Sequence, residues 1–120
     1  MSDRRNDVDF LADIEDSADK ISRYVYSMTF DEFCDDSKTV DAVVRNLEVI
    51  GEATKNISEF LKSQHSEIAW RGMAGLRDRL IHNYFGVDVE IVWKIAVDEV
   101  PVLLLTLHKI NGTTKEHSTI

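Results

Sequence analysis

Residues 77–84 (RDRLIHNY) bring together the side chains of this 120-residue chain that are best suited to chemistry at a phosphate. Arg77, His82 and Tyr84 lie within about two turns of a predicted helix. The planar guanidinium fork of arginine binds phosphate oxygens, and the histidine imidazole moves protons near neutral pH. No cluster of metal-ligating residues accompanies them in the sequence, so we expect neither a metal nor a cofactor. These residue types indicate acid–base chemistry at a phosphodiester.

The spacing of these residues raises a geometric question. On an ideal helix, Arg77 and His82 are five positions apart and are rotated by about 140°, so they do not share a face. Tyr84, seven positions after Arg77, does share its face. Two arrangements stay open at this point. Either the arginine reaches around the helix, or two copies of the chain bring the two residue types together.

Four main helices are predicted to position this segment. The first spans about residues 5–27, because apolar residues recur there at alternating spacings of three and four. These residues are Leu11, Ile14, Ala18, Ile21, Val25 and Met28. A short helical turn follows. The Thr29 side chain is placed to cap its start, and the Glu32 side chain, three positions later, is placed to bond back to the Thr29 backbone.

The second and third helices are predicted at about residues 38–62 and 71–85. Gly51 costs the second helix about 1 kcal/mol relative to alanine, so its presence predicts a close approach by another helix. Gly86 is the expected end of the third helix. The inward positions of the second helix are Val40, Val44, Leu47, Ile50, Ile57 and Leu61, and those of the third are Met73, Leu76, Leu80 and Tyr84.

The last helix is predicted to begin at Asp88, whose side chain can cap it. Pro101 should kink or divide this helix, and Asn111–Gly112 should end it. Its predicted inward positions are Ile91, Ile95, Leu104, Leu107 and Ile110. We therefore predict an all-α fold, an antiparallel helical bundle of four main helices over residues 1–110, with a polar C-terminal tail at residues 111–120.

Composition narrows the kinds of partner that fit. A net charge of -8 and a pI near 4.9 argue against a protein that coats nucleic acid through bulk positive charge. Any nucleic-acid site must then be a local cluster of basic side chains, a basic focus, which Arg71, Arg77 and Arg79 are expected to form. The single Cys34 excludes an internal disulfide. No apolar signal core or bilayer-spanning run is present in the sequence, so we expect a cytoplasmic protein without membrane attachment.

Several blocks of the sequence, taken in order, resemble one known family. The arginine-x4-histidine-x-tyrosine spacing of residues 77–84 is similar to the catalytic motif of HepT-like ribonuclease toxins, within the HEPN class of helical domains. Residues 44–53 (VRNLEVIGEA), 68–70 (IAW) and 85–88 (FGVD) resemble the family pattern on either side of that motif. The resemblance covers roughly four-fifths of the chain. Ala69 and Asn83 depart from it, where relatives often have proline and glycine, and neither departure touches the motif's arginine, histidine or tyrosine.

The resemblance implies a function and a set of partners. It implies an endoribonuclease toxin of a toxin–antitoxin module that cleaves RNA, with Arg77 and His82 as catalytic residues. It also implies a homodimer in which the motif helices of two subunits pair around the active site. Tyr84 then resembles the acceptor of AMP groups from a nucleotidyltransferase antitoxin. Asp78 and Arg79 are expected to support the site, Asp78 by orienting the imidazole.

Each of these residues also has a structural interpretation. His82 could simply bond to Asp78 one turn back, Arg77 could form an ion pair with Glu48 or Glu52, and Tyr84 could be a partly buried aromatic residue. The corresponding alternative for the whole protein is a non-catalytic helical module that presents substrate or surface to a nucleotidyltransferase. An arginine held in a buried ion pair away from His82 would favour that alternative.

Overall fold

The computed structural model describes residues 5–81 and 86–118, with side chains described up to residue 110, and all the named secondary-structure elements of these residues are helices. Three helices have 19 residues each: α1 (Asp7–Val25), α3 (Ser37–Lys55) and α8 (Val100–Ser118). The shorter elements are α2 (Phe30–Asp35), α4 (Glu59–Gln64), α5 (Trp70–Ala74), α6 (Leu76–Leu80), α7 (Val89–Lys94) and the π-helical segment η1 (Ile95–Glu99). The predicted all-α class is confirmed for these residues.

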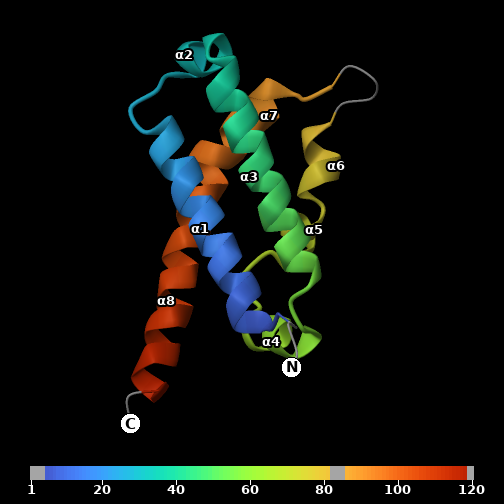
Figure 1. Cartoon of the computed structure of the whole chain (residues 1–120), viewed down its shortest axis with the longest axis vertical. Helices are drawn as coiled ribbons and strands as arrows, with labels where there is room; N and C mark the ends of the chain where they lie inside the picture. The colour runs from blue at the N-terminus through green and yellow to red at the C-terminus, as the bar shows by residue number, and fades with distance from the viewer. Residues whose placement is uncertain (1–4, 82–85, 119–120) are drawn as a thin grey trace.

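The long helices form the body of the bundle. Helix α1 packs against both α3 and α8 and runs antiparallel to them, while α5 and α6 cover another side of α3 (Figure 1). Buried apolar side chains from all of these layers form one continuous core. At the end occupied by α2, the ring of Phe33 is fully buried and lies 5.1 Å from the ring of Trp93. The bundle therefore presents the motif helix α6 on the outer side of α3.

Helix α1 and the turn after it form as the sequence predicts. Leu11, Ile14, Ala18, Ile21 and Val25 are all buried, which confirms the apolar stripe. The helix begins at a capping box, in which Asn6 and Asp9 each accept a hydrogen bond from the other's backbone N–H.

The predicted cap at Thr29 is also confirmed. The Thr29 hydroxyl accepts from the backbone N–H of Glu32 at 3.1 Å, and the Glu32 carboxylate accepts from the backbone N–H of Thr29 at 2.8 Å. These bonds satisfy backbone donors that the first turn of a helix leaves without partners. Helix α2 therefore begins where the spacing of threonine and glutamate places it.

The predicted second helix is wrong in its length. It ends at Lys55 instead of Lys62, and a new helix, α4, starts after Ser58. The Ser58 hydroxyl accepts from the backbone N–H of Leu61, and the Ser58 backbone N–H donates to the Asp7 carboxylate at 2.8 Å. The apolar positions Ile57 and Leu61 continue the helical spacing, but the serine cap and its bond to the start of α1 redirect the chain.

The expected close approach at Gly51 is confirmed. A Cβ atom built on this glycine would lie 3.2 Å from the Met73 carbonyl oxygen and 3.8 Å from the Leu76 Cβ. The first distance is tighter than ordinary van der Waals contact, so a side chain here would press against α5. The missing side chain lets the segment of residues 73–76, which leads into residues 77–84, lie directly on α3.

The last helical stretch begins as predicted and ends later than predicted. Asp88 caps α7 by accepting from the backbone N–H groups of Glu90 and Ile91. The α-helical pattern is interrupted at η1, which ends two residues before Pro101, as expected for a residue that has no N–H to donate. Helix α8 does not end at Asn111–Gly112 but continues to Ser118, so the helical pattern outlasts these two poor helix formers. None of the described helices is both long and apolar enough to cross a membrane.

Candidate active site

The motif segment is not the single long helix that the sequence predicts. The predicted helix at residues 71–85 is divided at Gly75 into α5 and α6, and α6 ends at Leu80. Ile81 is extended, with φ -99° and ψ 126°, and forms an isolated antiparallel bridge with Val87. β-branched residues favour this extended geometry. The Leu80 carbonyl accepts from the backbone N–H of Asp88 at 2.9 Å, so the chain on the two sides of residues 82–85 is joined.

This break changes the geometric argument about the motif. The 140° rotation between Arg77 and His82 assumes one continuous helix, and α6 stops two residues before His82. The need for a second subunit therefore no longer follows from helix periodicity. His82 and Tyr84 lie outside the described residues.

Helix α6 separates its apolar residues from its charged residues. Leu76 and Leu80 are buried in the core, which confirms their predicted inward positions. Arg77, Asp78 and Arg79, between them, are all exposed. Two leucines thus anchor a five-residue helix on α3, and three consecutive charged side chains reach the surface.

Arg77 is an exposed cation and forms no ion pair or hydrogen bond with another described residue. It lines a pocket of about 350 Å³ together with Glu48 and Glu52, the two carboxylates considered as its ion-pair partners. Neither carboxylate approaches any described arginine or lysine within 4.0 Å. The Arg77 guanidinium is therefore not held in an ion pair by any described acidic residue.

Arg79 differs sharply from Arg77, although it is only two residues away. Its Nη1 and Nη2 atoms donate to the two carboxylate oxygens of Glu99 at 3.0 and 2.7 Å. The hydrogen bonds to Glu99 raise the pKa of Arg79, with the charge of that carboxylate adding to the effect. This bidentate pair joins α6 to the last residue of η1 and occupies the guanidinium fork.

The predicted basic focus is not formed by all three arginines. Arg77 lines the pocket on α3, Arg79 bonds to Glu99, and Arg71 lines a separate, more open hollow beside α4. Helix geometry already separates the two arginines of α6, because Arg77 and Arg79 are two positions apart, are rotated by about 200° and do not share a face. The Asp78 side chain is exposed and forms no hydrogen bond or ion pair with another described residue.

The pocket beside Arg77 is built mainly from α3, with contributions from α1 and α5. Besides the residues named above, it is lined by Phe10, Asp13, Arg45, Val49, Gly51, Ala53, Lys55, Asn56 and Ala74. Arg45 and Lys55 were not singled out from the sequence. Arg45 lies inside a block that resembles the family pattern, which was an available signal, but nothing in the spacing of Lys55 connects it to Arg77.

Comparison with known proteins identifies the family of this chain. The family model described as "Ribonuclease HepT-like" matches residues 14–110. The "Probable ribonuclease HepT" of Thermococcus cleftensis is 46% identical over 100 residues, which cover 83% of this chain and 91% of the relative. The "Putative RNase MJ0127" of Methanocaldococcus jannaschii is 50% identical over 92 residues, covering 77% of this chain and 76% of the relative. No solved structure matches the chain significantly.

The family match includes every pocket-lining residue except Phe10 and Asp13. It runs from the middle of α1 through α3 and the motif helix to the buried Ile110. Both relatives carry names that describe RNA-cleaving enzymes. The chain therefore belongs to the ribonuclease HepT-like family, and RNA cleavage is the reaction class that comes with this membership.

Proposed function

We propose that the chain is a metal-independent endoribonuclease that acts as the toxin of a toxin–antitoxin module. One observation about Arg77 carries this proposal. Its side chain is exposed, lines a pocket and has no ion pair with a described residue, and it lies five residues before a histidine. The guanidinium of Arg79, two residues later, is instead occupied by Glu99. Arg77 keeps its fork available for a phosphate.

The proposed reaction uses the nucleophile that RNA itself carries. The ribose 2'-oxygen attacks the neighbouring phosphorus, an O2'–P bond forms, and the P–O5' bond breaks. The 2'-hydroxyl loses its proton to a base, and the departing 5'-oxygen gains one, which leaves a 2',3'-cyclic phosphate and a 5'-hydroxyl. His82 takes part in this proton transfer, a role worth about 10²- to 10⁴-fold in rate. Arg77 binds the non-bridging oxygens and stabilises their charge in the transition state.

The supporting residues have unequal roles in this proposal. Asp78 follows Arg77 directly and is exposed, which leaves its carboxylate available to orient the imidazole of His82. Arg79 supports the site indirectly, because its bond to Glu99 holds α6 against η1. Neither residue is assigned a proton-transfer step.

Assembly and control complete the proposal. We infer a homodimer in which the motif segments of two subunits face each other, as the resemblance to the family implies. The proposed antitoxin is a nucleotidyltransferase that moves AMP from ATP to the Tyr84 hydroxyl and releases pyrophosphate. The added phosphate places negative charge two residues from His82, where the RNA backbone must bind. This would block the site covalently.

A cleavage assay with a point variant and a chelator tests the reaction. Wild type should cleave single-stranded RNA equally well with and without EDTA, and its products should end in a 2',3'-cyclic phosphate. His82→Ala should lose at least about 100-fold in rate while its circular dichroism spectrum stays that of wild type. Undiminished cleavage by His82→Ala, or loss of wild-type cleavage in EDTA, would refute the mechanism. An RNA-inactive wild type that still binds a nucleotidyltransferase would favour the non-catalytic alternative.

A further inference from the structure

Three cations without ion pairs converge on the pocket that Arg77 lines. Half of the lysines and arginines whose side chains are described hold an acidic neighbour, as the pairs of Arg5, Lys20, Arg23, Lys62, Arg79 and Lys94 show. Arg45, Lys55 and Arg77 form no such pair with described residues, and all three line the same pocket. In a chain with 22 acidic and 14 basic residues, three such cations at one pocket make that pocket a candidate site for an anionic partner.

The acidic residues of the pocket do not cancel these cations. Asp13 is held by Arg5, with the Arg5 Nη2 atom 2.7 Å from the Asp13 Oδ2 atom. Glu48 and Glu52 are the other two carboxylates in the wall. The pocket lining therefore has three cations and only two carboxylates without an ion pair to a described residue, in a protein whose net charge is -8. With the Arg5–Asp13 pair counted as neutral, the lining carries one net positive charge, which favours the binding of an anionic polymer there.

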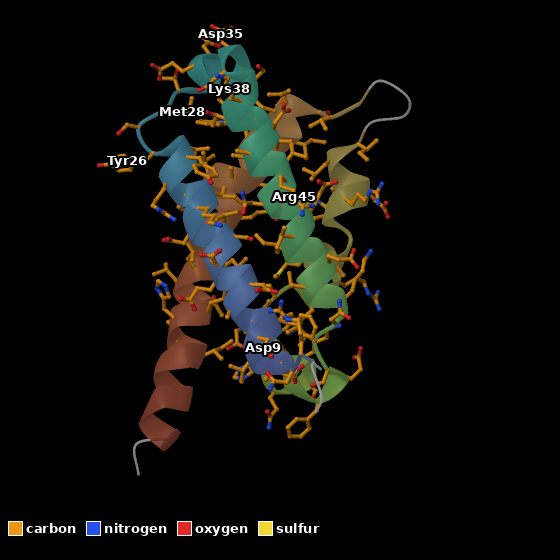
Figure 2. All side chains as sticks on the ribbon, viewed as in Figure 1. Asp9, Tyr26, Met28, Asp35, Lys38 and Arg45 are labelled. Atoms are coloured by element: carbon orange, nitrogen blue, oxygen red, sulfur yellow. The ribbon has the colours of Figure 1, made fainter. Side chains whose placement is uncertain are left out.

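The arrangement along α3 suggests a strand and not a single phosphate. Arg45 and Lys55 are ten residues apart, which corresponds to about 15 Å of helix. Successive nucleotides of a stacked strand are separated by only roughly 3.4 Å, so the two side chains are placed to contact phosphates of different nucleotides. Figure 2 shows Arg45 partway along α3, and both α3 and α6 contribute to the pocket.

We propose that Arg45 and Lys55 bind backbone phosphates of single-stranded RNA that flank the scissile phosphate held by Arg77. This inference rests on the proposed ribonuclease function and extends it from the reaction centre to the path of the substrate. The two residues position the strand and take no part in the proton transfers. Their binding energy should be the same in the ground state and the transition state, so it should appear in KM and not in kcat.

Charge-neutralising variants with a matched control test the inference. Arg45→Gln and Lys55→Gln each remove one cation from the pocket, and Lys38→Gln removes one from the same helix outside the pocket. Lys38 is exposed and has no ion pair with a described residue, so it controls for charge alone. The probe is a short single-stranded RNA with 2'-O-methyl groups, which cannot be cleaved, and its Kd is measured by fluorescence anisotropy at several salt concentrations.

We expect each pocket variant to weaken binding by roughly 2- to 5-fold at low salt, the range of an exposed ion pair. The slope of log K against log salt should fall by about 0.7 for each lost phosphate contact. With cleavable RNA, KM should rise and kcat should stay within about 2-fold of wild type. Lys38→Gln should match wild type in all of these quantities apart from a small loss common to any removed charge.

Several outcomes would overturn the inference while leaving the proposed function intact. One is a Kd and salt slope for Arg45→Gln equal to those of Lys38→Gln, with wild type still binding and cleaving RNA. Another is a fall in kcat without a change in KM, which would make the residue part of the reaction step. A changed mass in light scattering with unchanged RNA affinity would make the pocket a contact between copies of the chain. A wild type that neither binds nor cleaves RNA would instead overturn the proposed function itself.

Discussion

Arg77→Ala and Arg79→Ala should have opposite effects on activity and stability, although the two residues are neighbours on α6. Arg77 is exposed and uncommitted, whereas Arg79 holds Glu99 through both terminal nitrogens. Removing Arg77 should therefore cost catalysis and spare the fold. Removing Arg79 should cost some stability and spare most of the catalysis.

The stability changes can be worked from the surroundings of each side chain. Arg77 loses no ion pair or hydrogen bond with a described residue, so the free energy of unfolding should change by less than about 0.5 kcal/mol. Arg79 loses a bidentate pair whose two side chains are 41% and 51% exposed. Solvent screening limits such a pair to about 0.2–1 kcal/mol. The good geometry, with distances of 2.7 and 3.0 Å, places the expected loss in the upper part of that range.

The changes in rate follow from which guanidinium is available to the substrate. Loss of one preorganised donor to a developing oxyanion typically costs about 10²- to 10³-fold in kcat, and we expect this for Arg77→Ala. Arg79 already donates to Glu99, so Arg79→Ala should lose less than about 10-fold, through looser placement of α6.

Urea unfolding followed by circular dichroism gives the stability of wild type and both variants, and initial rates on a fluorogenic RNA give kcat. Glu99→Gln is the matched control, because it weakens the same ion pair without touching α6, and it should resemble Arg79→Ala in both assays. Equal losses of kcat for Arg77→Ala and Arg79→Ala would refute the distinction drawn between the two arginines. So would an Arg77→Ala protein that is destabilised by more than about 1 kcal/mol.

Three further predictions concern control, packing and pH. Tyr84→Phe should remain active and should gain no AMP when it is incubated with the proposed nucleotidyltransferase antitoxin, ATP and magnesium; equal mass gains on wild type and variant in intact-mass spectrometry would rule out Tyr84 as acceptor. Gly51→Val should lower the free energy of unfolding in urea by about 1–3 kcal/mol, because the Cβ of the added side chain would lie 3.2 Å from the Met73 carbonyl oxygen. An unchanged urea midpoint would show that α5 shifts to make room for the side chain. Hydrogen bonds from Thr39 lower the pKa of Asp36, so its carboxylate stabilises the folded state above pH 3.8, and this contribution is lost as pH falls through the folded-state pKa. The difference in urea midpoint between wild type and Asp36→Asn should therefore shrink below pH 3.8, and a constant difference from pH 6 to pH 2.5 would contradict this origin.

The sequence alone determined the features of this protein that depend on neighbours along the chain. The apolar stripe of α1 and the caps at Thr29 and Asp88 are where the residue spacing predicts them. These features were predictable because each rests on side chains and backbone groups within four residues of one another. Gly51 was predictable for a related reason, since a glycine inside a helix signals that something else must approach it closely.

Only the tertiary structure decided how the motif segment is held. Periodicity favoured one helix over residues 71–85, but Leu80 bonds to Asp88 and Ile81 pairs with Val87, and these contacts end α6 early. Likewise, the second predicted helix is redirected at Ser58, which bonds to Asp7, 51 positions earlier in the chain. Local spacing carries no information about such partners.

The distinction between the two arginines of α6 was also beyond the sequence. Arg77 and Arg79 are the same residue type in the same five-residue helix, and the family spacing alone singled out Arg77. What separates them physically is that Glu99, 20 positions away, comes within hydrogen-bonding distance of one and not the other. The pocket that joins Arg77 to Arg45 and Lys55 arises in the same way, because it exists only once α6 is packed on α3.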